Sequence, residues 1–264
     1  MNSLIELDHV TKAFGGLIAV KELTFQIREG SIVGLIGPNG SGKTTAFNLI
    51  SGVYRPDKGS VLLAGKKVSG KKSHVMAQLG VARTFQTVRP FSTMNVIENV
   101  AVGGLFGRNH SLSVRKANDR AEEILAYVGL TEKSRMPAGA LTLAEQRRLE
   151  LGRALSAQPR FLMLDELMAG LTHSEIAQTL DFLRRLSKER GITLLVIEHV
   201  MKAIIQLCES VVVLDHGEKI AEGSPSQVIS DEKVIRAYMG EKATRNKSEA
   251  PSFGEVDQPP KRDN

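Results

Sequence analysis

The chain has 264 residues, a formal net charge of +6 and one cysteine, Cys208. This length suits one large domain, or one domain with an inserted subdomain, that buries a substantial core. A lone cysteine excludes an intrachain disulfide and is typical of a reducing compartment. The apolar runs are strand-sized and residues 1–8 carry no basic segment, so we expect neither a membrane span nor a signal peptide. Trp is absent and no basic run is interleaved with aromatics, so we expect a solvated surface and no nucleic-acid partner.

The first predicted elements are two strands, each with one solvent-exposed face. Leu4 to Val10 and Ala19 to Arg28 alternate apolar and polar residues, which predicts an antiparallel layer. We place Phe14 on the loop between them. There its ring either stacks on a ligand base or closes the core of the hairpin, and the sequence leaves both interpretations open.

The next segment is a glycine-rich loop between a short apolar run, Ser31 to Ile36, and the start of a helix at Ala46. Its residues fit the spacing G-x-x-x-x-G-K-[ST] of a phosphate-binding loop: Gly37, Pro38, Asn39, Gly40, Ser41, Gly42, Lys43, Thr44 and Thr45. The glycines let backbone N–H groups point inward, and the helix N-terminus adds positive potential. Lys43 supplies a charge to the β- and γ-phosphates and Thr44 a hydroxyl to Mg²⁺. An ordinary glycine-rich turn is the alternative, but it leaves the Lys-Thr pair unexplained.

A small hairpin and a helical region follow. Ser60 to Leu63 and Lys66 to Val68 flank the Ala64-Gly65 turn, and Leu79 to Gln86 is predicted to be a strand that ends in the Gln86 amide. From residue 87 to about 160, apolar residues recur at helical spacing. We interpret this region as a helical subdomain inserted into an α/β core.

Two of the next predicted strands are followed by acidic or histidine side chains that could act in catalysis. Phe161 to Glu166 is a buried strand ending in two carboxylates, of which Asp165 is placed to hold Mg²⁺ and Glu166 to polarise an attacking water. Solvated acids at a strand end are the alternative. Ile192 to Ile197 is the next strand, and His199 after it is placed to hydrogen-bond a γ-phosphate; a cap or surface histidine is the alternative.

The last ordered elements are an amphipathic helix, a hairpin and a short helix. The helix spans Ser174 to Arg190 and precedes the strand that leads to His199. The hairpin spans Ser210 to Glu222, and Ser224-Pro225 starts the short helix. Residues 241–264 mix charges and prolines with few apolar residues, which predicts a disordered tail.

These motifs, in this order over residues 4–240, resemble the ATP-binding subunit of an ABC transporter. The resemblance implies an α/β fold: a P-loop NTPase core with an N-terminal antiparallel β layer and an inserted α-helical subdomain, together one nucleotide-binding domain over residues 1–240. It implies that the ligands are ATP and Mg²⁺. It also implies that Phe14 stacks on adenine, that Gln86 contacts Mg²⁺ and senses the membrane subunit, and that Glu166 and His199 are the catalytic base and switch histidine. Residues 169–172 resemble the family's dimer-contact loop.

One segment departs from the family pattern. The family signature Leu-Ser-Gly-Gly-Gln, which clamps the partner subunit's γ-phosphate, is replaced here by Leu141, Thr142, Leu143, Ala144 and Glu145. Both glycines are lost and Glu145 puts a carboxylate where an amide is usual. Read alone, Thr142-x-x-Glu145 is a helix capping box, in which Glu145 turns back to the Thr142 N–H. We hypothesise that the composite site completed by this signature hydrolyses ATP more slowly than its counterpart.

Within the family, the chain is similar to ATP-binding subunits of branched-chain amino acid importers. The similarity lies in residues 14–20, 82–91, 96–100, 147–150 and 197–201. It implies a second ATP-binding subunit in a hetero- or homodimer, two transmembrane permeases, a periplasmic or extracellular solute-binding protein, and a peripheral position on the cytoplasmic face of the cell membrane. The alternatives are the ATPase of a lipid or polysaccharide exporter and a soluble ABC ATPase acting on nucleic acid or ribosomes.

Overall fold

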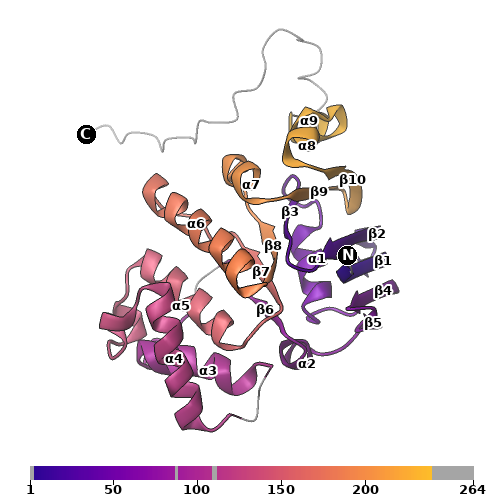
Figure 1. The fold of residues 1–264 in the computed structure, drawn as a ribbon. Coiled ribbons are helices and arrows are strands. Elements are labelled where there is room, and N and C mark those ends of the chain that lie inside the picture. The colour runs from indigo at the N-terminus through magenta and orange to yellow at the C-terminus, as the bar shows by residue number, and fades with distance from the viewer. Residues whose placement is uncertain (1–2, 87–88, 109–111, 240–264) are drawn as a thin grey trace, which may run out of the picture.

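The chain folds into two β-sheets and a set of helices, seen in a computed structural model that describes residues 3–86, 89–108 and 112–239 (Figure 1). The first sheet is antiparallel and has the order β2-β1-β4-β5. Its strands are β1 (Ser3–Phe14), β2 (Leu17–Arg28), β4 (Lys58–Leu63) and β5 (Lys66–Lys67). Alternating burial along β1 and β2 turns one face of this layer toward the core.

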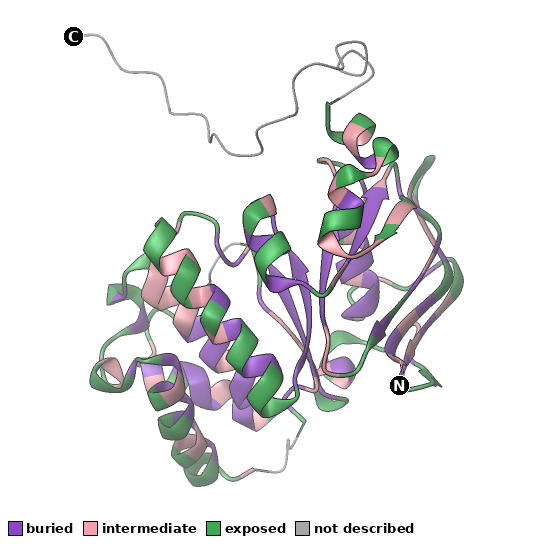
Figure 2. Ribbon diagram, turned by 45° about the horizontal axis from the view of Figure 1, so that its top comes forward, coloured by how far each residue is buried: buried purple, intermediate pink, exposed green. Residues whose placement is uncertain are grey.

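The second sheet is parallel except at one edge and has the order β10-β9-β3-β8-β7-β6. Its strands are β3 (Ile32–Ile36), β6 (Val81–Arg83), β7 (Phe161–Asp165), β8 (Thr193–Ile197), β9 (Ser210–Asp215) and β10 (Glu218–Gly223). The strands β3, β7 and β8 are buried along their whole length, as expected for a parallel sheet covered on both faces (Figure 2). Loops that follow these three strands therefore meet at one edge of the sheet.

The helices cover the parallel sheet on its two faces. They are α1 (Lys43–Ile50), α2 (Ser73–Gln78), α3 (Val96–Phe106), α4 (Val114–Val128), α5 (Leu143–Ser156), α6 (His173–Arg190), α7 (Met201–Leu207), α8 (Pro225–Ser230) and α9 (Glu232–Met239). Helix α1 packs in one apolar cluster with the antiparallel layer and one face of the parallel sheet. Helices α3 to α7 share the other cluster with the opposite face. Among helices in the described ranges, none has the length and apolarity needed to cross a membrane.

Most predicted elements are present, and several of their boundaries were wrong, two of them beside predicted site residues. Phe14 lies at the end of β1, paired with Leu17, because the turn at Gly15-Gly16 lets both strands continue to the tip. The strand predicted to reach Gln86 ends at Arg83: the Thr84 N–H still donates to the Met163 carbonyl of β7, but the Phe85 N–H donates to the Glu150 side chain. The tail predicted over residues 241–264 lies outside the described residues.

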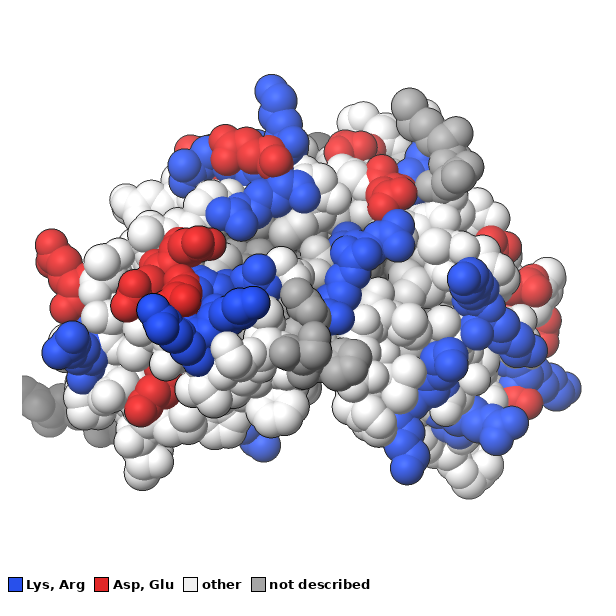
Figure 3. Space-filling view, turned by 60° about the horizontal axis from the view of Figure 1, so that its bottom comes forward, with Lys and Arg blue, Asp and Glu red and all other residues white. Residues whose placement is uncertain are grey.

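Lys and Arg side chains are concentrated on one part of the molecular surface. Lys and Arg side chains gather over the lobe formed by the antiparallel layer and α2, whereas the other lobe mixes both signs (Figure 3). Exposed lysines on this lobe are Lys58, Lys66, Lys67, Lys71 and Lys72. No aromatic residue occurs between Lys58 and Lys72 in the sequence.

Candidate nucleotide-binding and hydrolysis site

The glycine-rich loop joins the end of β3 to the first residue of α1. Gly37 and Gly42 have φ values of 149° and 101°. A Cβ would lie 2.1 Å from the Leu214 carbonyl oxygen at Gly37 and 2.5 Å from the Ala19 carbonyl oxygen at Gly42. Only glycine fits both the dihedral angle and the space, so this backbone path depends on these two residues.

Lys43 is held inside the loop that it follows. Its Nζ donates to the carbonyl oxygens of Gly37 (2.7 Å) and Pro38 (2.9 Å), and the residue is 7% exposed. Burial lowers the pKa of the ammonium, and the charges of Glu166 and Asp165 oppose that change. The Oγ of Ser41 is buried with no hydrogen-bond partner among the described residues. An unpaired hydroxyl and a buried ammonium in one loop fit a bound phosphate.

A cavity of about 540 Å³ brings this loop together with the predicted catalytic side chains. It is lined by Leu17, Ile18, Ala19, Asn39, Gly40, Ser41, Gly42, Lys43, Thr44, Thr45, Gln86, Glu166, Ile197, His199 and His216. Residues predicted separately from four places in the sequence thus share one concave surface. Its size lies in the range of small-molecule sites.

Glu166 is the centre of a hydrogen-bonded group in this cavity. The Oε2 atom accepts from Gln86 Nε2 and the Oε1 atom contacts His199 Nε2, both at 2.8 Å. Glu166 has a φ of 50°, uncommon for a residue with a side chain, and its N–H donates to the Ile197 carbonyl. The strained backbone and the two partners fix the carboxylate at the edge where β7 and β8 end.

Asp165 is buried and bound by an arginine that the sequence analysis missed. Arg83 donates to Asp165 Oδ2 (2.7 Å) and to Asn48 Oδ1 on α1 (2.6 Å). The Asp165 N–H donates to Thr84 Oγ1 (3.2 Å). Asp165 is absent from the cavity lining, unlike Thr44 and Gln86. Arg83 therefore ties the end of β6 to α1 and to the end of β7.

The predicted magnesium ligands are all oxygen donors. Thr44 offers a hydroxyl, Gln86 an amide carbonyl and Asp165 a carboxylate, which is the chemistry that Mg²⁺ prefers. The described residues contain no cluster of three His, Cys, Asp or Glu side chains that could hold a metal by itself. This donor set fits an ion that shares its coordination with nucleotide phosphates.

Phe14 lies beside the cavity and not in its lining. Its ring is 42% exposed and meets Tyr54 edge-on at 5.1 Å between centroids. The Lys12 ammonium lies 5.4 Å from the ring centre. Leu17 and Ile18, from the start of β2, line the cavity instead. Stacking of Phe14 on adenine remains a prediction.

The divergent signature forms the N-terminus of α5. Thr142 is the N-cap: its Oγ1 accepts from the Glu145 N–H, and Glu145 Oε2 accepts from the Thr142 N–H at 3.0 Å. The other Glu145 oxygen pairs with Lys133. These hydrogen bonds, first of all that from Lys133, lower the pKa of Glu145. Leu141 is buried and Leu143 is 47% exposed. Leu141, Leu143 and Ala144 are all absent from the lining of the nucleotide cavity.

Helix α5 also holds the segment that carries Gln86, through a buried pair that sequence patterns did not reveal. Glu150 Oε1 accepts from the Phe85 N–H at 2.8 Å. Arg147 donates to the carbonyl oxygens of Phe85 (3.2 Å) and Gln86 (3.0 Å). Burial raises the pKa of Glu150. The sequence does show that Arg147 and Glu150 share one helical face, but this spacing does not indicate which loop they bind.

Glu198, next to His199, is a second buried carboxyl group that was missed. It is 4% exposed, and its Oε1 accepts from the Met168 N–H at 2.8 Å. Burial raises the pKa of Glu198 to about 7, the Glu166 charge adds to the rise, and the N–H groups of Met168 and His199 and the Arg147 charge oppose it. Glu198 thus joins the histidine segment to the segment that follows Glu166.

The fold and this site define a P-loop ATPase, and comparisons with known proteins agree. A family model described as ABC transporter matches residues 20–169, and one described as branched-chain amino acid ATP-binding cassette transporter matches residues 218–244. The chain belongs to the ABC transporter family, as an ATP-binding and ATP-hydrolysing subunit.

Relatives of this chain include named transport proteins. The branched-chain amino acid transport ATP-binding proteins BraF of Pseudomonas aeruginosa and LivG of Escherichia coli K12 are each 39% identical to it over 250 residues, covering 90% of this chain and 98% of the relative.

Solved structures show the same fold. An ATP-binding cassette of an ABC transporter in its ADP conformation has a TM-score of 0.81 at 29% identity, covering 91% of this chain and 100% of that chain. A dimeric bacterial ABC transporter cassette has a TM-score of 0.76 at 25% identity, covering 84% and 98%.

Proposed function

We propose that this chain hydrolyses ATP at the cavity around Lys43 and Glu166 to drive an importer of branched-chain or related hydrophobic amino acids. One observation carries the catalytic part: Gln86 and His199 converge on the Glu166 carboxylate in the cavity that also contains the Lys43 loop. The solute class comes from the names of BraF and LivG and from the match over residues 218–244.

The proposed roles follow from the positions of the side chains. Lys43 and the inward N–H groups of its loop bind the phosphates. Glu166 takes a proton from the attacking water, and His199 keeps the base and the γ-phosphate aligned. Thr44, Asp165 and Gln86 would hold Mg²⁺, which neutralises charge on the phosphate oxygens.

The segment that carries Gln86 connects the helical region to the proposed catalytic base, Glu166. The Gln86 side chain binds Glu166, and its backbone carbonyl is bound by Arg147 of α5. A movement of α5 therefore changes the position of Gln86 and the environment of Glu166. We propose on this basis that residues 1–240 form one nucleotide-binding domain, with the subdomain of residues 87–160 coupled to a permease.

The assembly we propose contains two ATP-binding subunits, two transmembrane permeases and a periplasmic or extracellular solute-binding protein. The dimeric cassette among the similar structures supports the pairing of ATP-binding subunits. The relatives named as transport proteins support a peripheral position on the cytoplasmic face of the membrane.

Uptake by proteoliposomes tests the proposal. The complex that co-purifies with the chain is reconstituted with its solute-binding protein, and leucine uptake is measured with ATP inside the vesicles. We expect uptake with the unmodified chain and none with Lys43→Ala. ATP hydrolysis without uptake of any hydrophobic amino acid would contradict the solute assignment.

A further inference from the structure

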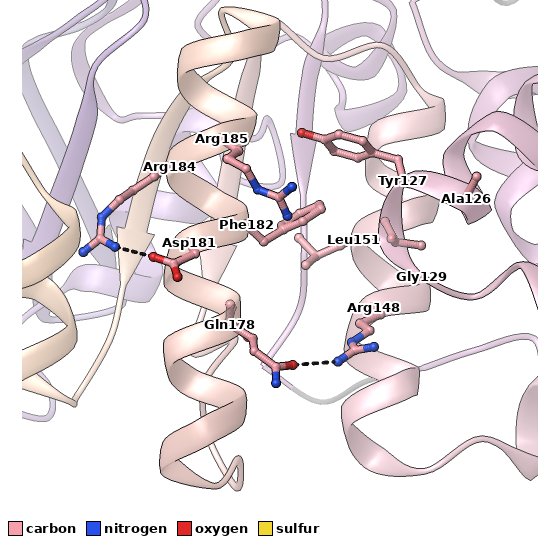
Figure 4. A pocket seen from close by; sticks show the side chains of 12 residues that line it. Ala126, Tyr127, Gly129, Arg148, Leu151, Gln178, Asp181, Phe182, Arg184 and Arg185 are labelled. Carbon is pink, nitrogen blue, oxygen red and sulfur yellow. Dashed lines mark hydrogen bonds and ion pairs between the residues drawn. The ribbon is translucent and has the colours of Figure 1, made fainter.

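A second cavity, of about 740 Å³, lies between helix α6 on one side and helices α4 and α5 on the other (Figure 4). None of its lining residues lines the nucleotide cavity. Its volume is sufficient for a small organic molecule. Its lining includes three arginines and one acid, Asp181.

The positive charge in this cavity comes from two facing walls. Arg148 projects from α5 and donates to the neutral Gln178 amide oxygen at 3.2 Å. Arg185 projects from α6 toward α4 and α5, and no hydrogen bond or ion pair within the described ranges holds it. Arg148 has no ion-pair partner there either, although its charge contributes to the lowered pKa of Glu175, whose carboxylate binds Thr172.

The single lining acid is already paired on the other side of α6. Asp181 binds Arg184 at 2.7 Å, and Arg184 also donates to the Gln206 carbonyl at 2.9 Å. Figure 4 shows both side chains turned away from Arg185. No carboxylate is therefore free in this lining to bind an ammonium group.

The rest of the lining is apolar and aromatic. Tyr127 and Phe182 pack at 5.2 Å between ring centroids, and Leu151 and Val128 are buried beside them. The Tyr127 hydroxyl is buried with no hydrogen-bond partner among the described residues. An apolar surface beside unpaired donors is the environment that binds an anion with a hydrocarbon body.

We propose that this cavity binds a small organic carboxylate with an aliphatic or aromatic body, clamped between Arg148 and Arg185. Guanidinium groups match the planar carboxylate, and Phe182 and Leu151 contact the body. The absence of a free acid in the lining disfavours zwitterionic amino acids.

Occupation of the cavity links two functional helices. Helix α5 begins at the Thr142 signature, and α6 begins after the segment that carries Glu166. The two segments already meet, because a Cβ at Gly170 would lie 3.1 Å from the Leu143 side chain. A carboxylate bound to both arginines fixes α5 relative to α6, and so regulates how the signature and the catalytic carboxylate are positioned.

Isothermal titration of the full chain, without nucleotide, tests the site. The probe is isocaproate, and the matched ligand is isocaproamide, which has the same body and no charge. We expect isocaproate to bind and the amide and inorganic phosphate to bind at least about tenfold more weakly. We expect Arg185→Ala and Arg148→Ala to weaken isocaproate binding roughly tenfold.

Lys188→Ala is the matched control, because it removes an exposed cation of the same helix that does not line the cavity and leaves the Asp181–Arg184 pair intact. We expect it to change the affinity by less than about twofold, with melting curves confirming that all variants fold. The site is refuted if isocaproate does not bind, if Lys188→Ala weakens its binding as much as Arg185→Ala, or if the amide or phosphate binds as tightly as isocaproate. ATP binding by the same samples is measured separately, so failure here leaves the nucleotide site unaffected.

Discussion

Replacing Glu198 by Gln should stabilise the protein at alkaline pH. The carboxyl group is 4% exposed, and its pKa is raised from 4.5 to about 7, first by burial and then by the Glu166 charge. Gln keeps an oxygen to accept the Met168 N–H and has no charge to bury. The change therefore removes the titration while retaining the hydrogen bond.

The pH dependence follows from linkage. Between about pH 4.5 and 7 the folded chain keeps a proton on Glu198 that the unfolded chain releases. The contribution of Glu198 to the free energy of unfolding therefore falls as pH rises through this window and stays low above it. The advantage of Glu198→Gln over the unmodified chain should grow by about 2–3 kcal/mol between roughly pH 5 and 8.

Urea unfolding of both proteins at the two pH values measures this difference. All other titrating groups are common to the pair, so they cancel in the comparison. Glu189→Gln, at an exposed position of α6, is the matched control and should show no such trend. A Glu198→Gln advantage that is the same at both pH values would show that the carboxyl group does not carry a raised pKa.

Four further substitutions test the nucleotide site and the signature. Glu166→Gln should still bind ATP, because the phosphate loop is intact, but its turnover should fall by at least about a hundredfold, because the base is lost. Filter binding measures ATP binding, and phosphate release measures turnover. Rapid hydrolysis would contradict the assignment. Lys43→Ala should lose ATP binding in an equilibrium assay with a fluorescent ATP analogue, whereas tight binding would show that the ammonium is not a phosphate ligand. Glu145→Gln should raise the ATPase rate of the assembled transporter a few-fold, and Lys133→Met, which removes the cation paired with Glu145, should lower it. An unchanged rate in Glu145→Gln would count against a slower composite site.

Local sequence patterns predicted the strands and the phosphate loop well. Strand β7 is five apolar or acidic residues with every position buried, and the glycine-rich loop has a spacing that few other structures require. The capping box at Thr142 was predicted and is present, because both hydrogen bonds lie within one helical turn. These features depend on residues close together in the chain.

What the sequence did not reveal depends on contacts between distant segments. The pairing of Arg83 with Asp165 spans β6 and β7, and Glu150 binds the Phe85 N–H from another element. No periodicity identifies such partners. The end of β6 was misplaced for the same reason, since the Phe85 N–H finds its acceptor on a helix.

The central claim is that this chain is the ATPase of a membrane importer, and one purification tests it most directly. Tagged Glu166→Gln protein with ATP is isolated from solubilised native membranes, with Lys43→Ala in parallel, and co-purified proteins are identified by mass spectrometry. Our account predicts two apolar permeases and a second ATP-binding subunit, with the ATPase pairing weakened in Lys43→Ala. Recovery of ribosomal proteins or DNA, without a permease, would contradict the transport function and leave the ATPase chemistry standing.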